Sequence, residues 1–204
     1  MTLIVIHLDV LDVIRLAYPQ PDEPRLPAAV RDAVELFVQA VMPPLFSYVN
    51  DVPLNIVSGL LGLVLDRVNV QVVLRTKIGV SMLTMLISRA ELIKQNMGST
   101  SEENWNQWNN LYSRLFDLAE PVLPYIFSTE SVSTSEDVHV WQFLATMGVG
   151  ASPDQQQRLV LGVKERVMET VGVSKTLPSD MAQVKLGEVN LFMRAIGLDV
   201  ELLG

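Results

Sequence analysis

The chain has 204 residues, of which 49% are hydrophobic, and with a mean hydropathy of +0.30 we expect one domain with a large core and some apolar surface that meets a partner. It contains no cysteine, which excludes disulfides, thiol catalysis and thiolate metal sites and fits a reducing compartment. The net charge of −8 opposes general attraction to nucleic acid.

The N-terminal segment, residues 1–17, is apolar from its start, with no turn or capping residue ahead of it. It lacks a basic leader and a small-residue cleavage site, so we do not interpret it as a secretory signal. The abrupt start predicts that the chain is a fragment of a longer protein. The best apolar run, Val52 to Leu65, is interrupted by Pro53, Asn55 and Ser58, so we predict no transmembrane helix and no membrane partner.

Helical spacing begins after the proline-rich residues 19–27. Apolar side chains there recur at steps of four, three and four, at Val30, Val34, Phe37 and Val41. Asp51 is the predicted N-cap of the next helix, which has Pro53 in its first turn and runs through Leu65. A further helix, from about Ser81 to Gln95, has a narrow polar stripe, which predicts a central position in its domain.

Residues 68–74 leave two interpretations open, because polar and apolar side chains alternate there briefly. Such alternation favours a strand. Elsewhere no persistent alternation and no two-residue hairpin turn indicates a sheet. We therefore expect a helix and keep a strand as the alternative.

The next helix is predicted to begin with a capping box, formed by Ser99 with Glu102 or by Thr100 with Glu103. Its apolar residues step by three or four positions, at Trp105, Trp108, Tyr112, Leu115 and Ala119. Polar, mostly uncharged side chains fill the opposite side of this helix. It is thus amphipathic.

Pro121 and Pro124 are expected to disturb the end of that helix. After a polar loop at 127–136, another helix is predicted to run as far as Gly148. Residues 152–155, Ser-Pro-Asp-Gln, form a strong start signal with serine as the N-cap and proline at the first helical position.

Gly172 is the predicted left-handed stop of the helix that starts at residue 153. A last short helix is predicted from Leu186 to Ile196, ended by Gly197. Together these elements predict an all-α fold, an α-α superhelix of the HEAT/armadillo-like α-solenoid kind.

An internal echo suggests a repeat, since residues 41–47 resemble residues 122–128. We therefore expect a single domain over 1–204 with two sub-repeats, at about 28–98 and 99–172. Chance similarity is the alternative, because most intervening positions do not match.

Catalytic chemistry has little support in the sequence. The two histidines, His7 and His139, lie in unrelated segments without metal-ligand spacing. No Gly-x-Ser-x-Gly nucleophile elbow occurs, and the glycines at 148 and 150 lack the rest of a phosphate loop. We predict a non-enzymatic protein with no cofactor and no metal.

Candidate partner-binding residues lie on the tryptophan-rich helix. Core packing is one interpretation of its aromatic side chains, and anchoring of a partner is the other, because Trp and Tyr are enriched at binding hot spots. The candidates are Trp105, Trp108, Asn109 and Tyr112.

A basic stretch interrupts the acidic chain, with five cations and one anion, Glu91, over residues 67–94. Three interpretations stay open: a solvated surface, docking of an acidic partner, or contact with RNA phosphates. The absence of interleaved aromatic residues weakens base stacking. The cations are Arg67, Arg75, Lys77, Arg89 and Lys94.

Three runs of sequence resemble the C-terminal domain of the Pat family of mRNA decapping activators, also called topoisomerase II-associated proteins, and are most similar to fungal members. The resemblance covers about residue 68 to the end, and the first third less closely. The runs are residues 77–89, 150–171 and 190–203.

The resemblance implies an α-α superhelix from a scaffold protein of cytoplasmic processing bodies. It implies binding of the Lsm ring at oligoadenylated mRNA 3′ ends, binding of short leucine-rich helical motifs of the decapping enzyme's catalytic subunit, and a contribution to RNA binding. The family domain has further helices and a basic stretch upstream that this chain lacks, and the acidic balance of the chain opposes RNA binding.

Overall fold

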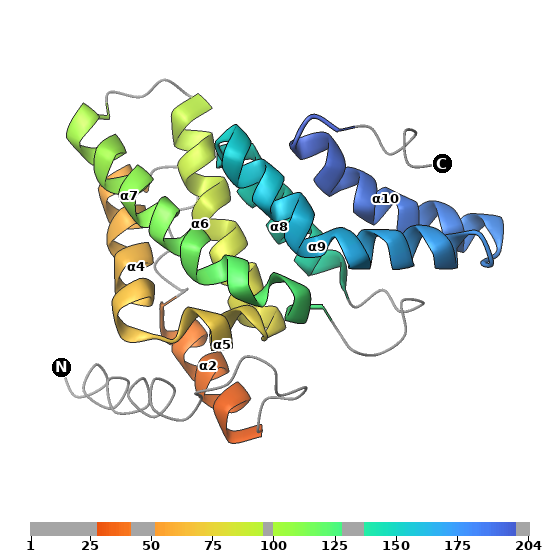
Figure 1. Cartoon of the computed structure of the whole chain (residues 1–204). Helices are drawn as coiled ribbons and strands as arrows, with labels where there is room; N and C mark the ends of the chain where they lie inside the picture. The colour runs from red at the N-terminus through yellow and green to blue at the C-terminus, as the bar shows by residue number, and fades with distance from the viewer. Residues whose placement is uncertain (1–27, 42–51, 96–99, 128–136, 199–204) are drawn as a thin grey trace. The chain divides into compact units, whose positions relative to one another are not determined.

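The computed structural model describes residues 28–41, 52–95, 100–127 and 137–198, and every regular element within them is a helix (Figure 1). These elements are α2 (Ala28–Val41), α4 (Leu54–Arg67), α5 (Val70–Leu74), α6 (Lys77–Gln95), α7 (Glu102–Ala119), the 3-10 helix η1 (Glu120–Tyr125), α8 (Val138–Gly150), α9 (Pro153–Ser174) and α10 (Ser179–Ala195). None of these helices is long and apolar enough to span a membrane. The chain divides into two compact units, Met1–Ala119 and Glu120–Gly204.

In the first unit α6 is central, as its narrow polar stripe predicts, and it packs against α2, α4 and α5. It begins at Lys77, four residues earlier than expected. Near this start Gly79 allows α5 to approach closely, because a Cβ atom there would lie 2.3 Å from the carbonyl oxygen of Val73. Its fully buried side chains include Met82, Leu83, Leu86 and Ile87.

Residues 70–74 form the short helix α5, so the strand alternative is wrong. Asn69 caps this helix, since its Oδ1 accepts a hydrogen bond from the Gln71 N–H at 3.0 Å. Val72, Val73 and Leu74 are all buried. A half-buried strand would bury every second side chain, whereas here three consecutive side chains are buried. The brief alternation in the sequence therefore does not indicate a strand.

Two helix starts differ from the prediction. Pro53 has extended backbone and is itself the N-cap of α4, rather than a first-turn residue; Asp51 lies outside the described residues. At the start of α7 the Ser101 Oγ accepts from the Asn104 N–H at 3.3 Å, so Ser101 rather than Thr100 caps this helix; Ser99 lies outside the described residues. Three consecutive hydroxyl residues precede this helix, and the sequence alone does not show which of them caps it.

In the second unit α10 packs on α8 and α9, and η1 packs on α9. The 3-10 helix η1 follows α7 at the two prolines that were expected to disturb it. Aromatic rings fill the core between these elements: the ring centroids of Phe127 and Trp141 are 4.8 Å apart, and those of Trp141 and Phe192 are 6.1 Å apart.

The predicted capping box at the start of α9 is confirmed. The Ser152 Oγ accepts from the Gln155 N–H at 3.3 Å, and the Gln155 Oε1 accepts from the Ser152 N–H at 3.0 Å. The predicted stop at Gly172 is wrong, because α9 continues to Ser174. Thr170 and Ser174 are buried, so an extra half-turn extends the packed face of the helix.

The last helix is longer than predicted, since α10 begins at Ser179 rather than Leu186. Its predicted end is confirmed: Gly197 has φ 72°, and the Leu198 N–H donates to the Met193 carbonyl oxygen at 2.9 Å. This is the hydrogen bond of a Schellman ending, which glycine favours because it adopts the left-handed region without a Cβ penalty. α8 likewise runs two residues past its predicted end, to Gly150.

Candidate protein-docking surfaces

The four predicted partner-binding residues all lie on α7, and they differ in burial. Trp108 and Tyr112 are only 3% and 5% exposed, and their ring centroids are 6.5 Å apart. Trp105 is half-buried and Asn109 is exposed. This burial corrects the surface assignment of Trp108 and Tyr112, which pack in the first unit. Only Trp105 and Asn109 stay candidates for partner contact.

The environment of Tyr112 supports its role in packing. Burial raises the pKa of its phenol well above the ordinary value, and the negative charge of Glu91 on α6 raises it further. Glu91 is also 3.8 Å from the ammonium of Lys94. The phenol therefore stays protonated at neutral pH, where it is a neutral core group.

The predicted basic residues on α6 do not share one face. An α-helix advances about 100° and 1.5 Å per residue, which places Lys94 roughly 100° around the axis from Lys77 and about 25 Å along it. Arg89 lies between them in sequence, about 120° from Lys77. Contact with RNA phosphates along this helix would need the cations on one face, and they do not share one.

The remaining two cations lie outside α6. Arg75 is half-buried at the C-terminal end of α5, where its N–H donates to the Val72 carbonyl oxygen at 3.1 Å. Arg67 is the last residue of α4, and its side chain lies outside the described residues. The described part of the stretch is therefore spread over several surfaces.

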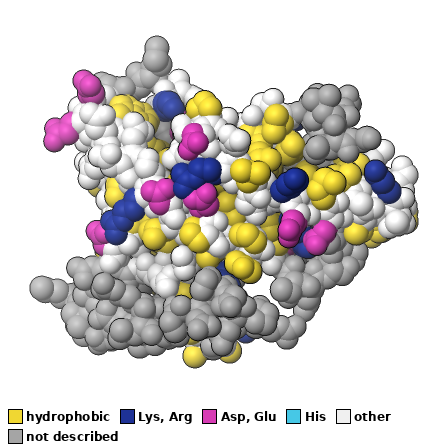
Figure 2. Space-filling view, viewed as in Figure 1, with side chains coloured by type: hydrophobic (Ala, Val, Ile, Leu, Met, Phe, Trp, Pro, Cys, Tyr) yellow, Lys and Arg dark blue, Asp and Glu magenta, His cyan; other side chains and the backbone are white. Residues whose placement is uncertain are grey.

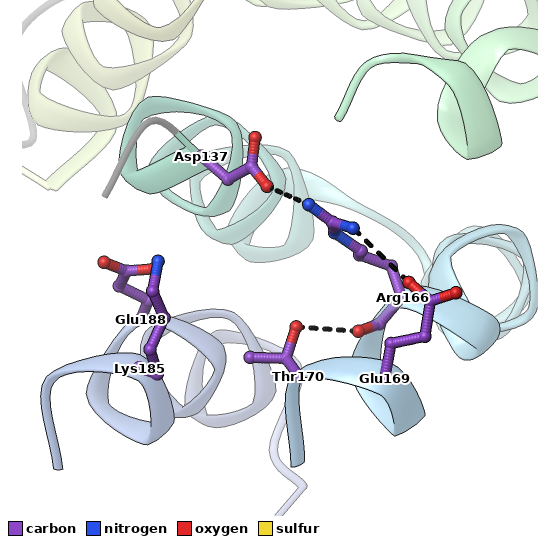
Figure 3. Close-up of polar contacts among 6 residues, drawn as sticks. All are labelled: Asp137, Arg166, Glu169, Thr170, Lys185 and Glu188. Atoms are coloured by element: carbon purple, nitrogen blue, oxygen red, sulfur yellow. Dashed lines mark hydrogen bonds and ion pairs between the residues drawn. The ribbon is translucent and has the colours of Figure 1, made fainter. Parts of the chain in front are cut away.

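Figure 3 shows a charged cluster where α8, α9 and α10 meet in the second unit. The guanidinium of Arg166 donates to the carboxylate of Asp137, and its Nη1 lies 3.3 Å from Glu169 Oε2. The same guanidinium lies 5.3 Å from the ring centroid of Phe127. Asp137 is buried, so this network neutralises a carboxylate that would be costly to leave unpaired.

A second pair lies on α10, where the Lys185 Nζ is 3.2 Å from the Glu188 Oε2 and both side chains are 7% exposed. These buried charges are paired within the protein, and their arrangement fits a structural role. Among the described residues no group of three or more histidine, aspartate or glutamate side chains could hold a metal ion. His139 is half-buried on α8, and His7 lies outside the described residues.

The outer side of α10 carries an apolar stripe that is absent from the predicted site residues. Met181, Val184 and Leu191 are about half exposed, at 48%, 59% and 47%. Figure 2 shows hydrophobic side chains on the visible face in the region of α9 and α10. We call these three residues the α10 stripe. Their spacing of three and seven is visible in the sequence. However, α10 also has an apolar side that packs inward, and periodicity alone does not distinguish the exposed apolar side from the buried one.

Comparison with known proteins places this chain in a family. The model of the family "Topoisomerase II-associated protein PAT1" matches residues 1–201. The chain belongs to the PAT1 family. This membership confirms the resemblance that the three sequence runs indicate.

Two curated PAT1 relatives are fungal mRNA-decapping factors. The deadenylation-dependent mRNA-decapping factor pdc2 of Schizosaccharomyces pombe is 33% identical over 96% of this chain. The factor PAT1 of Saccharomyces cerevisiae is 26% identical over 96% of the chain. The chain spans about a quarter of the length of both relatives, 26% and 25%.

Solved structures of the C-terminal domain of S. cerevisiae Pat1 share the fold. One superposes with a TM-score of 0.68 at 22% identity, covering 94% of this chain and 82% of the other. The likeness confirms the predicted all-α, α-α superhelical fold class. Other structures of that domain hold Dcp2 peptides called HLM3, HLM2 and HLM10, and each peptide spans 17 residues, at 484–500, 435–451 and 954–970.

Proposed function

We propose that this chain is a non-enzymatic scaffold in cytoplasmic mRNA decapping and 5′-to-3′ decay, concentrated in P-bodies. In this role it docks short leucine-rich helical motifs of the decapping enzyme's catalytic subunit, and it docks the Lsm ring. The observation that carries the proposal is family membership over residues 1–201. The Dcp2 peptide complexes of the same fold support the first partner.

The surface of the chain is compatible with docking of a helix. Short amphipathic helices bind apolar grooves and faces through side chains spaced three and four residues apart. Exposed apolar side chains of this kind lie on α10. On the first unit Trp105 and Asn109 offer a half-buried aromatic ring beside a polar, uncharged face, which suits the Lsm ring as a second contact.

The scaffold role is tested by two pull-downs with the purified chain. One uses a reconstituted Lsm ring, and the other uses immobilised 17-residue leucine-rich peptides from the decapping subunit. We expect both to retain the chain. The matched control is the same peptide with each leucine replaced by aspartate, which should retain none. Failure of both the ring and the leucine peptides contradicts the scaffold role.

A further inference from the structure

We propose that the outer face of α10 is the docking site for a leucine-rich helix of about 17 residues, an inference that rests on the proposed function. The site consists of the α10 stripe and the exposed Gly187 between its members. No residue of this face belongs to the predicted site. The inference assigns the ligand of the scaffold to one helix of the second unit.

The exposed apolar residues of α10 have the spacing of a helix-packing line. Positions 181, 184, 188, 191 and 195 follow the alternating steps of three and four that define the contact line of a two-helix coiled coil. Met181, Val184 and Leu191 on this line are exposed, Ala195 is half-buried, and Leu198 continues the spacing past the helix end, also exposed. The line therefore presents exposed apolar side chains on both sides of its middle position, Glu188, which is buried.

A hole in the sense of helix packing lies in the middle of that line. In helix packing, a side chain of one helix inserts between four residues of the other, at positions i, i+3, i+4 and i+7. On α10 these positions are Val184, Gly187, Glu188 and Leu191. Gly187 is exposed, and a Cβ atom built on it would have no neighbour within 4 Å. Glu188 is folded inward onto Lys185. The surface between these four positions is therefore open at Gly187, where a ligand side chain can approach the helix.

The length of α10 and the charges near its ends fit a helical ligand of defined length and charge. α10 has 17 residues and so is about 25 Å long, which matches a fully helical 17-residue ligand. Asp180 and Arg194 are exposed near its two ends, about 14 residues apart and on the same side of the helix axis as Gly187. A ligand with a basic residue at the Asp180 end and an acidic residue at the Arg194 end fits this face best.

The test measures binding of a fluorescent 17-residue leucine-rich decapping peptide by polarisation. Gly187→Leu fills the hole, and Leu191→Glu places a charge on the stripe. Both positions are exposed, so the fold should be kept, which circular dichroism checks. We expect each variant to bind at least tenfold more weakly than the wild type.

Matched controls lie on α9 in the same unit. Gly172 is another exposed glycine with no neighbour within 4 Å of a built Cβ, and Leu161 is 63% exposed. Gly172→Leu and Leu161→Glu make the same chemical changes outside the α10 face. We expect wild-type affinity for both. If the α9 variants weaken binding as much as the α10 variants, the α10 assignment is wrong.

A positive readout uses the absence of native cysteine. Val184→Cys gives a single thiol on the stripe, and a peptide with cysteine at its central leucine should form a disulfide with it under mild oxidation. Cysteine at Leu161 should cross-link much less. Equal cross-linking at both positions overturns the inference.

The outcomes separate the two proposals. Absence of peptide binding by the wild type removes the proposed function and this inference together. Wild-type binding that survives both Gly187→Leu and Leu191→Glu removes only the α10 site and leaves the scaffold role standing. A wild-type dimer in light scattering that Leu191→Glu converts to a monomer also overturns the inference, because the occupant is then a second copy of the chain.

Discussion

Glu120 and Arg158 show how one pair of side chains ties η1 to α9. The Arg158 Nε donates to the Glu120 Oε1 at 2.9 Å, and both side chains are about one-third exposed. The hydrogen bond from Arg158 lowers the pKa of Glu120 below its ordinary value, against a smaller opposing effect of desolvation. The link therefore depends on an ionised carboxylate.

This pair predicts a pH-dependent contribution to stability. A depressed folded-state pKa stabilises the protein above the unfolded value, about 4.3 for glutamate, and the contribution is lost as the pH falls through the folded-state pKa. We expect Glu120→Gln to be less stable than the wild type at pH 7 by about 0.2–1 kcal/mol, since the pair is partly exposed. The deficit should shrink at about pH 3.

Thermal unfolding at the two pH values measures this difference. Glu165→Gln replaces an exposed carboxylate of α9 and is the control. Its stability relative to the wild type should be the same at both pH values. An equal deficit for Glu120→Gln at both pH values would show that the interaction with Arg158 does not need the charge.

At the scale of elements, close helix packing depends on a few positions without a side chain. α5 and α6 meet at Gly79, whose Cβ would lie 2.3 Å from the Val73 carbonyl oxygen and 2.6 Å from the Thr76 Oγ1. That hydroxyl already donates to the Val73 carbonyl at 2.9 Å and accepts from the Gly79 N–H at 3.1 Å. A methyl group has no space unless the α5–α6 corner moves.

We therefore expect Gly79→Ala to lower the free energy of unfolding by about 1–3 kcal/mol, as overpacking does in other cores. Gly172→Ala is the contrasting variant, because its Cβ meets nothing within 4 Å; it should raise stability by about 0.5–1 kcal/mol through helix propensity. Urea unfolding followed by circular dichroism measures both. A neutral Gly79→Ala would show that the corner can open without cost.

At the scale of the whole molecule, the net charge of −8 coexists with a locally basic segment. The exposed cations Lys77 and Lys94 lie on different sides of α6, and Lys94 is close to Glu91. A continuous phosphate-binding track is therefore not formed by this helix. Docking of proteins through apolar surface fits this distribution better than direct RNA binding.

The RNA alternative has its own test. We expect Lys77→Glu with Lys94→Glu to leave RNA binding by the chain unchanged, because these side chains do not act together. Fluorescence anisotropy with an oligoadenylate RNA at several salt concentrations measures it. Arg75 is kept, because it is half-buried and its replacement risks the fold. A large loss of affinity, with a steep salt dependence in the wild type, would favour the RNA-binding module instead.

The sub-repeat prediction stays open after the structure. The compact units meet between Ala119 and Glu120, whereas the predicted sub-repeats meet between residues 98 and 99. Much of the echo behind the repeat, including Pro43 and Pro44, lies outside the described residues. Whether the two units derive from one repeated element therefore stays a proposal.

The sequence by itself determined the helical class, the capping box at Ser152, the stop at Gly197 and the family, because these depend on residues that are neighbours in the chain. Only the tertiary structure decided which apolar faces are covered. Trp108 lies inside, whereas Met181, Val184 and Leu191 lie outside. Both sets have helical spacing. Spacing shows which residues share one face of a helix, but it does not show which other element covers that face. The position of that element follows from contacts between distant segments, so the sequence did not distinguish a core aromatic from an anchor or indicate the free side of α10.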